Sequence, residues 1–279
     1  MSATVPRGGT LRRSRSVRAR ICAAVIGAVL LIALLGPLLA PHSPTAAVTA
    51  PYATPGAGHL LGGDHLGRDV LSRLLDGGPS VVLTTTVATA VSVAVGTLAG
   101  LVTALLGHRS SRRGGAVMRP LDALAAVPPV LALLLVLTTV PGRLGVVLAV
   151  SAASAPLCAR VVHAAAAPVL RRPHGELAIA RGESWGWLLR YEVLPLVSPT
   201  VLAELGLRFV LALYLVTAAG FLGVGPTGTD WGTLVVEALP GAALQPAALL
   251  APLLLIAVLA VGVNLLSDTM THRERETAR

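Results

Sequence analysis

Long apolar stretches separated by short arginine-bearing segments dominate the chain. A helix needs about 20 apolar residues to cross a hydrocarbon core about 30 Å thick. Six stretches reach that length, so the pattern predicts an all-α integral membrane protein with six transmembrane helices. The predicted spans cover residues 21–40, 80–106, 118–140, 144–167, 196–222 and 246–267. Proline and glycine interrupt some spans, as at Pro128-Pro129 and Gly206, which membrane helices tolerate when neighbouring groups satisfy the freed backbone.

The basic residues predict the orientation of these spans. The chain has 22 basic residues besides histidine, and every one is arginine. With six spans and the N-terminus inside, eighteen arginines lie in cytosolic segments and three outside. Positive charge accumulates on the cytosolic side of membranes, so both termini and the loop 173–195 are predicted to be cytosolic. Residues 1–20 and 269–279 then form cytosolic tails, with 21–40 as the first transmembrane helix.

Composition supports a membrane protein and narrows its chemistry. Of the 279 residues, 54% are hydrophobic and 13% are charged, whereas soluble domains have about a quarter charged residues. The absence of lysine excludes a phosphate-binding loop of the form GxxxxGK[ST], so any ATP hydrolysis belongs to another chain. The net charge of +9 follows from the cytosolic arginines and does not indicate nucleic-acid binding.

The region between the first two spans divides into two parts. Residues 41–60 are rich in Pro, Ala and Thr without periodicity, which is typical of an extended extracytoplasmic linker. In 61–75, Leu66, Val70 and Leu74 share one helical face. This spacing predicts a short helix at the outer membrane interface, so that 41–79 forms a linker plus an interfacial helix.

No catalytic or metal-binding motif emerges. Cys22 and Cys158 have no CxxC spacing, which argues against a disulfide framework or a zinc site. His59, Asp64 and His65 do not have the spacing of ligands on one helical face, so no metal site is predicted.

A spaced motif lies in the loop 173–195. Glu176-Leu177-Ala178 is followed by Gly182 and later by Leu194-Pro195. Good helix formers follow Pro173, and glycine at 182 permits a turn that β-branched residues resist. The loop is predicted to form two short helices along the membrane, with Pro195 ending the second before the fifth span.

This spacing resembles the "EAA" loop of ABC-importer permeases, in which Glu-Ala-Ala is followed by Gly and then by Leu-Pro. Leu177 stands where the family has its first Ala, and Glu192 stands where it has Ile. In that family the loop binds an ATPase subunit. The resemblance therefore implies that Glu176, Ala178, Gly182, Leu194 and Pro195 couple the chain to an ATPase.

Four further segments resemble the C-type permease of dipeptide, oligopeptide and nickel ABC importers. They are Leu61–Leu75 (family LGTDxxGRDVLSRLL), Met118–Asp122 with Val127-Pro128 (MRxxDxxxAFP), Phe221–Gly225 with Asp230–Gly232 (FLGLG and SWG), and Asn264–Asp268 (NLLGD). All four occur in the family's order, and with the loop motif they extend over most of the chain.

The resemblance implies a type-1 ABC importer permease fold, with its core over 80–268. It implies a transport subunit that performs no chemistry, carries no cofactor and leaves ATP to its partners. Those partners would be a second homologous permease, two ATP-binding cassette subunits and an extracytoplasmic solute-binding protein, in the bacterial cytoplasmic membrane. The solutes of that family include peptides, nickel and related small molecules.

Two charged residues fall inside the fifth predicted span. Glu204 and Arg208 are four residues apart and therefore share one helical face. Each alone costs about 2.5–3.5 kcal/mol at the bilayer centre, so pairing is expected. They line a translocation path or form a structural ion pair, and the second interpretation is favoured because they satisfy each other.

Two other functions remain as alternatives. An ion-gradient-driven secondary transporter would use Glu204 or Asp122 as its ion site. A membrane scaffold or enzyme subunit without transport activity would tolerate deletion of 174–195. Neither alternative explains the loop spacing together with the motif in 61–75.

Overall fold

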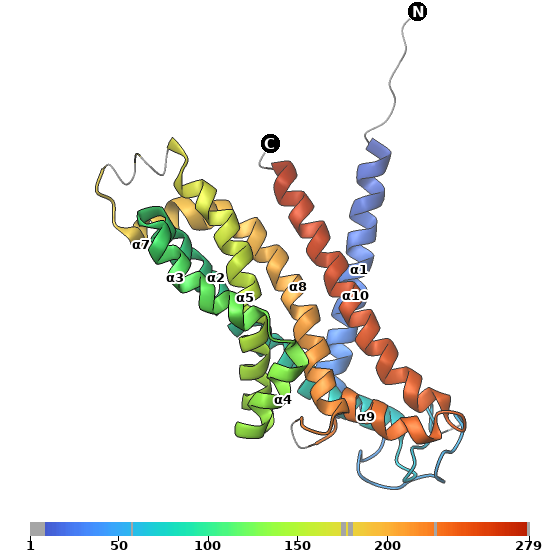
Figure 1. The fold of residues 1–279 in the computed structure, drawn as a ribbon. Helices are drawn as coiled ribbons and strands as arrows, with labels where there is room; N and C mark the ends of the chain where they lie inside the picture. Colours follow the sequence, from blue (N-terminus) through green and yellow to red (C-terminus); the bar gives the residue numbers. More distant parts are fainter. Residues whose placement is uncertain (1–8, 57, 174–176, 178–180, 226–227, 278–279) are drawn as a thin grey trace, which may run out of the picture.

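The computed structural model describes residues 9–56, 58–173, 177, 181–225 and 228–277. Within these ranges every regular element is a helix, which confirms the predicted all-α class (Figure 1). In chain order the elements are α1 (Gly9–Leu39), α2 (Val70–Arg109), α3 (Ser111–Ala125), α4 (Pro129–Thr139), α5 (Gly142–Leu170), α7 (Trp185–Trp187), the π-helical turn η1 (Leu188–Val193), α8 (Leu194–Phe221), α9 (Trp231–Ala238), the 3-10 turn η2 (Leu239–Gly241) and α10 (Pro246–Thr277).

Four helical runs are long and apolar enough to cross a membrane. They are α2, α5, the run Trp185–Phe221 and Pro246–Ser267 of α10. The bent pair of α3 and α4 makes a fifth if it counts as one span, and Ala24–Leu39 of α1 is a shorter apolar helix. The described residues therefore make a multi-pass bundle with four or five spans by length and composition, and the count of six stays a prediction.

The span predicted over 118–140 is broken at its Pro128-Pro129 interruption. There α3 and α4 meet at an angle of 90°. Pro128 and Pro129 have no backbone N–H to donate, and proline restricts the residue before it to extended conformations, so the helix stops. Pro129 then opens α4 at its first turn, where a missing N–H costs nothing.

The short interfacial helix predicted over 61–75 is also wrong. Residues 41–69, called here the cap segment, fold into hydrogen-bonded turns, and α2 begins only at Val70. Gly62 and Gly67 both have a φ of +74°, outside the helical region. The carbonyl of Gly67 accepts backbone N–H groups from Val48 and Thr49. The cap segment is thus folded back on itself rather than extended.

The bundle has one loop-bearing end and one cap-bearing end. Figure 1 shows the first turn of α1, the last turns of α10, the α2–α3 turn and α7 at one end, called the loop end. The cap segment and α9 lie at the opposite end, called the cap end. Helix α2 runs from one to the other. With 40 residues and a rise of 1.5 Å per residue, it is about 60 Å long.

Close packing of α2 on α5 holds the centre of the bundle. A Cβ placed on Gly96 would lie 2.6 Å from the Cβ of Cys158, and one on Gly100 would lie 2.6 Å from the carbonyl oxygen of Ala159. Small residues allow membrane helices to approach this closely. An alanine at either glycine would therefore push the two helices apart.

Candidate functional site

The structure places three of the five predicted coupling residues. Glu176 and Ala178 lie outside the described residues. Gly182 is exposed, has a φ of +80°, and has open space around the position of a Cβ. That φ favours glycine, since other residues pay a steric cost there. Leu194 and Pro195 are exposed at the start of α8.

A continuous helical run begins just after Gly182. The hydroxyl of Ser184 accepts the N–H of Trp187 at 3.3 Å and caps α7. From there α7, η1 and α8 follow one another without a break, so the prediction that Pro195 ends a separate helix is wrong. Pro195 has no N–H to donate, and its ring crowds the preceding turn. The π-helical turn just before it is wider than an α-helical turn and makes room for the ring, so the helix continues.

Two side chains anchor this element in the bundle. Leu188 is 2% exposed and Val193 is 1% exposed. Both belong to a cluster with residues of α2 and α5, including Leu101, Val162 and Leu170. Burying one such side chain contributes about 1.5–3 kcal/mol to stability relative to leaving it exposed to water. The η1 turn is therefore anchored in the buried cluster that α2 and α5 share.

Aromatic and arginine side chains cover the exposed side of the element. The Arg109 guanidinium lies 4.1 Å from the ring centroid of Trp185. The rings of Trp187 and Tyr191 are 5.5 Å apart, and the guanidinium of Arg190 is 5.8 Å from the ring of Tyr191. Arginine and aromatic residues are enriched where proteins bind other proteins.

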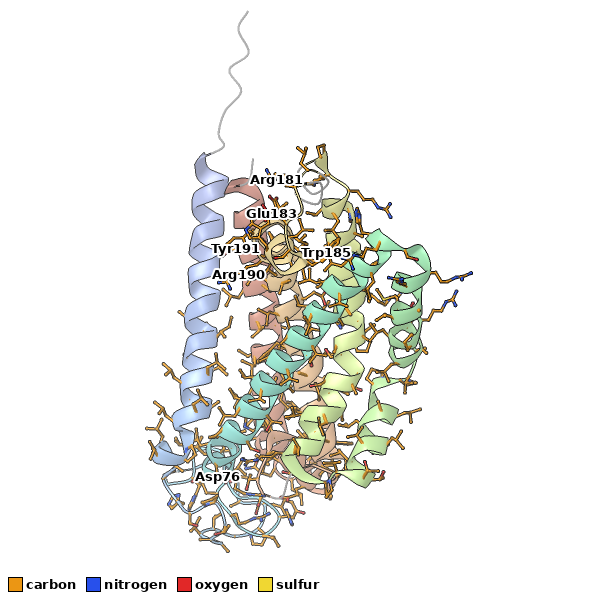
Figure 2. All side chains as sticks on the ribbon, turned by 90° about the vertical axis from the view of Figure 1, so that its left-hand side faces the viewer. Asp76, Arg181, Glu183, Trp185, Arg190 and Tyr191 are labelled. Atoms are coloured by element: carbon orange, nitrogen blue, oxygen red, sulfur yellow. The ribbon has the colours of Figure 1, made fainter. Side chains whose placement is uncertain are left out.

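These residues lie together at one end of the molecule. Figure 2 shows Arg181, Glu183, Trp185, Arg190 and Tyr191 gathered at the loop end, far from Asp76 at the cap end. We call these five residues the loop surface. Tyr191 is 59% exposed, so this surface is open to a partner in the isolated chain.

Glu204 and Arg208 form the ion pair that their spacing predicts. The Nε of Arg208 donates to Oε2 of Glu204 at 2.8 Å, and each side chain is 7% exposed. The pair lies in α8, in the same helical run as Trp185, Arg190 and Tyr191 of the loop surface. A role in the translocation path stays a prediction.

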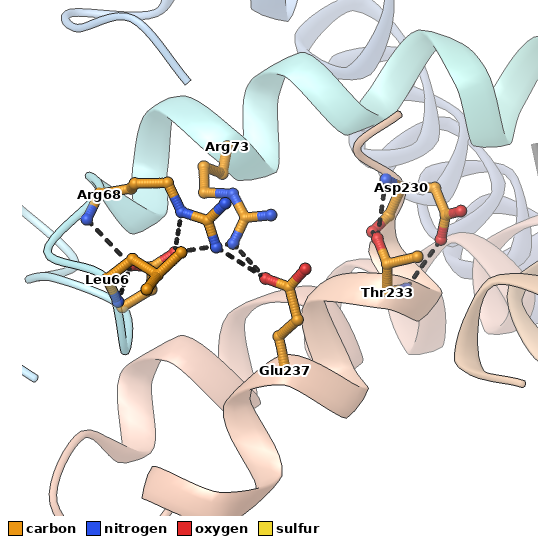
Figure 3. Close-up of polar contacts among 7 residues, drawn as sticks. Leu66, Arg68, Arg73, Asp230, Thr233 and Glu237 are labelled. Atoms are coloured by element: carbon orange, nitrogen blue, oxygen red, sulfur yellow. Dashed lines mark hydrogen bonds and ion pairs between the residues drawn. The ribbon is translucent and has the colours of Figure 1, made fainter. Parts of the chain in front are cut away.

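The sequence did not reveal a second group of charges at the cap end (Figure 3). Arg73 Nη1 contacts Asp64 Oδ2 at 2.7 Å and also Glu237 Oε2. Arg68 contacts the same two carboxylates, at 2.7 and 3.0 Å. We call these four residues the cap network. It joins the cap segment, the first turn of α2 and α9.

The cap network changes the titration of Asp64. Burial alone raises the pKa of this carboxyl group, but hydrogen bonds from the N–H groups of Arg68 and Leu66 and from the Arg68 side chain lower it. The net effect holds the pKa of Asp64 below its ordinary value. The motif in 61–75 pointed to this segment, but no local signal connected it with Glu237.

Helix α9 is docked on α2 by its first residues. Asp230 caps α9 by accepting the N–H of Thr233 at 2.9 Å, and the Thr233 hydroxyl oxygen accepts the Asp230 N–H at 3.1 Å (Figure 3). The indole N–H of Trp231 donates to the carbonyl of Leu74 at 3.0 Å. Burial raises the pKa of Asp230. The hydrogen bonds that its carboxylate accepts from backbone N–H groups lower the pKa, but by less, so the net shift is upward.

Residues 96–275 match the family described as "Binding-protein-dependent transport system inner membrane component". The chain belongs to this family. The resemblance to ABC-importer permeases inferred from the motifs is thereby confirmed, and this permease is a multi-pass membrane component of such a system.

Relatives of known name support the assignment. The permease is 28% identical to the probable D,D-dipeptide transport system permease protein DdpC of Escherichia coli, with 88% of this chain and 83% of that protein covered. It is 32% identical to the di/tripeptide transport system permease protein DppC of Pseudomonas aeruginosa, over 75% and 72%. It is 29% identical to the glutathione transport system permease protein GsiD of Pectobacterium atrosepticum, over 77% and 71%.

Solved structures share the fold. The permease matches a chain of the MetNI methionine ABC transporter in an inward-facing conformation with a TM-score of 0.53 and 18% identity. The match covers 70% of the permease and 94% of that chain. A second crystal form of the same transporter gives a TM-score of 0.55.

Proposed function

We propose that this permease is one membrane subunit of an ATP-driven, binding-protein-dependent importer for peptides or related small solutes. The named relatives transport D,D-dipeptides, di- and tripeptides and glutathione, which supports peptides as the solute class. Nickel, which the sequence resemblance also allows, has no support among those three names. The permease would form half of the translocation pathway, and a second homologous permease would form the other half.

The proposal includes six spans with both termini in the cytosol. The arginine distribution supports it, because eighteen of the 22 basic residues fall in the segments that this orientation makes cytosolic. The arrangement of the helix ends also agrees, since the start of α1, the end of α10 and α7 lie at the same end of the bundle. The cap segment would then face the solute-binding protein outside the cell.

The loop surface is the proposed contact for the ATP-binding cassette subunits. The observation that carries this assignment is the uninterrupted helical run from Trp185 to Phe221, anchored by Leu188 and Val193. A partner that grips α7 differently in its ATP-bound and nucleotide-free states would move α8 as a rod and α2 and α5 through packing. ATP would be bound by the partners, and this subunit would need no cofactor.

Cross-linking tests the proposed contact. Single cysteines replace Arg181 or Glu183 in a variant whose native Cys22 and Cys158 are serine, and a matched cysteine replaces Leu60, which is 72% exposed in the cap segment. With the partner subunits co-expressed, we expect cross-links to the ATPase from 181 and 183 and none from 60. Labelling of 181 or 183 by a membrane-impermeant maleimide in intact cells would overturn the orientation.

Transport measurements test the energy source. In proteoliposomes containing the assembled complex, solute uptake should require ATP and should persist with an ionophore present. Uptake that survives ATP depletion and stops with an ionophore would instead identify an ion-gradient-driven transporter.

A further inference from the structure

Two imidazoles and one carboxylate converge in the cap segment, beside the cap network but separate from it. His59 Nδ1 lies 3.4 Å from Asp69 Oδ1, and His42 Nδ1 lies 3.7 Å from Asp69 Oδ2. The two histidine rings are 4.9 Å apart between centroids. One potential ligand atom from each of the three residues lies within 4.8 Å of the other two. The residues come from the chain just after α1, from the middle of the cap segment, and from the N-cap of α2.

The separations are close to those of a tetrahedral metal site. Bonds of about 2.0–2.2 Å from zinc to nitrogen or oxygen place neighbouring ligand atoms about 3.3–3.6 Å apart in a tetrahedral site. The 3.4 Å from His59 Nδ1 to Asp69 Oδ1 has this length, whereas the 3.7 Å from His42 Nδ1 is measured to the other carboxylate oxygen, Oδ2. One ligand atom from each residue lies within 4.8 Å of the other two, so the two imidazoles would close in on a single carboxylate oxygen to complete three of the four corners.

The donor atoms have the chemistry that such an ion needs. The Nδ1 of His42 is buried and has no hydrogen-bond partner within the part of the chain that the structure describes. Buried polar atoms in proteins nearly always have a hydrogen-bond partner, and a bound ion would account for this exception. Without an ion, His59 Nδ1 can donate a hydrogen bond to Asp69 Oδ1 at 3.4 Å. An ion would replace that proton, and with the proton on Nε2 each imidazole presents its Nδ1 lone pair toward the shared point. The carboxylate of Asp69 supplies a negative oxygen.

Ser72 holds the carboxylate and His42 in place. Asp69 is 1% exposed on its side chain, and its Oδ2 accepts the N–H of Ser72 at 2.9 Å and the hydroxyl at 2.6 Å. The backbone N–H of His42 donates to the same hydroxyl oxygen at 3.1 Å. Hydrogen bonds of this kind orient a ligating carboxylate. The histidine side chains are 32% and 23% exposed, which leaves a path for an ion and a water molecule.

A neighbouring cluster is a poorer candidate. Asp64, His65 and Glu237 also lie within reach of one point. Both of those carboxylates, however, are bound by the guanidinium groups of Arg68 and Arg73, which would repel a cation. The same pairing neutralises the two arginines, so they oppose a cation at Asp69 less than free arginines would.

We propose that His42, His59 and Asp69 bind one divalent transition-metal ion, with a water molecule as the fourth ligand. Two imidazoles and a carboxylate suit Zn²⁺, and Cu²⁺ and Ni²⁺ are the expected competitors. The ion would be resident in the cap segment and distinct from any transported solute. It would tie the end of α1 to the start of α2, across the turns of the cap segment.

Titration of the full-length permease tests the proposal. The protein, purified in detergent and stripped with a chelator, is titrated with Zn²⁺ alone, and with Co²⁺ for its visible absorption. We expect one ion per chain and the strong visible bands of tetrahedral Co²⁺. His42→Ala and His59→Ala should each weaken binding by at least about tenfold, the lower end of the loss caused by changing even an outer partner of a ligand.

Matched variants and a second measurement keep the test decisive. His65→Ala and His163→Ala should bind Zn²⁺ as the unmodified permease does. Zn²⁺ should also slow hydrogen exchange in residues 42–72 of the unmodified protein, a measurement that needs no variant. Binding only at millimolar Zn²⁺, binding unchanged in His42→Ala/His59→Ala, binding lost in His65→Ala, or unchanged exchange in 42–72 would each overturn the proposal.

Discussion

The guanidinium of Arg109 covers the ring of Trp185, so the last residue of α2 contacts the first residue of α7. The same helix α2 is capped by Asp69 at its other end. One helix about 60 Å long therefore connects the loop surface with the cap segment. A movement of the loop surface can reach the cap end through α2 as well as through α8.

The Arg109–Trp185 contact should be measurable as a coupling energy. Arg109→Ala, Trp185→Ala and the double variant form a double-mutant cycle, with thermal unfolding in detergent as the measurement. An exposed cation–π contact contributes about 0.5–1 kcal/mol. The losses in unfolding free energy of the two single variants should therefore add up to more than the loss in the double variant, by that amount. Arg112, exposed on the neighbouring α3, is the matched control, and Arg112→Ala should combine additively with Trp185→Ala. Additive effects at Arg109 as well would contradict the contact.

The backbone conformation at Gly182 predicts a graded series. Its φ of +80° costs other residues about 1–2 kcal/mol, most for β-branched side chains. Gly182→Val should lose most solute uptake while membrane insertion continues, whereas Gly182→Asn, which tolerates this conformation, should retain most of it. Gly186→Ala changes a helical glycine with open space around it and serves as control. Equal uptake by the Val and Asn variants would show that the turn does not matter.

Asp230 should destabilise the permease as the pH rises. Burial raises its folded pKa above the unfolded value of 3.8, so the protonated form is favoured in the folded state. The associated stability is complete below pH 3.8 and is lost as the pH rises through the folded pKa. Asp230→Asn keeps an oxygen to accept the Thr233 N–H but carries no charge. Its melting temperature relative to the unmodified permease should therefore be higher at pH 7 than at pH 4.

The comparison with the unmodified permease is essential because Asp64 titrates in the opposite sense. Its folded pKa lies below 3.8, so its contribution is present above pH 3.8 and lost as the pH falls further. Both proteins retain Asp64, and the difference between them isolates Asp230. A melting-temperature difference that is the same at pH 4 and pH 7 would contradict the role assigned to burial.

The cap network should depend more on Arg73 than on Arg68. The Arg73 side chain is 5% exposed and that of Arg68 is 17% exposed, although each contacts both carboxylates. Removing one partner of a buried pair costs about 3–5 kcal/mol. Arg73→Met should approach this loss in unfolding free energy, and Arg68→Met should cost clearly less. The reverse order would show that the contacts of Arg68 hold the cap segment.

The pair in α8 separates structural from transport roles. Glu204→Leu should cost about 3–5 kcal/mol because it leaves Arg208 buried and unpaired, whereas replacing both with Leu should be nearly neutral. Competition uptake assays with peptides of different terminal charge then compare the double variant with the unmodified permease. An unchanged preference would remove the pair from the pathway, and an altered preference would place it there.

Local sequence patterns predicted the helices, but they failed where a helix end or a turn depends on backbone dihedral angles. Apolar length predicted α2, α5, α8 and α10, because burial of a helix in lipid depends mainly on composition over a short window. The sequence indicated an interruption at Pro128-Pro129 but not the 90° bend there, and it did not predict the turns at Gly62 and Gly67. The helix end expected at Pro195 is wrong because the preceding turn widens and the helix continues through the proline.

Residues close together in the chain were enough to infer the all-α class, the family and the i, i+4 pairing of Glu204 with Arg208. Three other contacts join residues far apart in the sequence and are seen only in the folded chain: Arg73 with Glu237, Trp231 with Leu74, and His42 with Asp69. These partners are brought together by the packing of α9 and α1 against the start of α2. Such packing depends on the shapes of whole helix faces, which no short window of sequence contains.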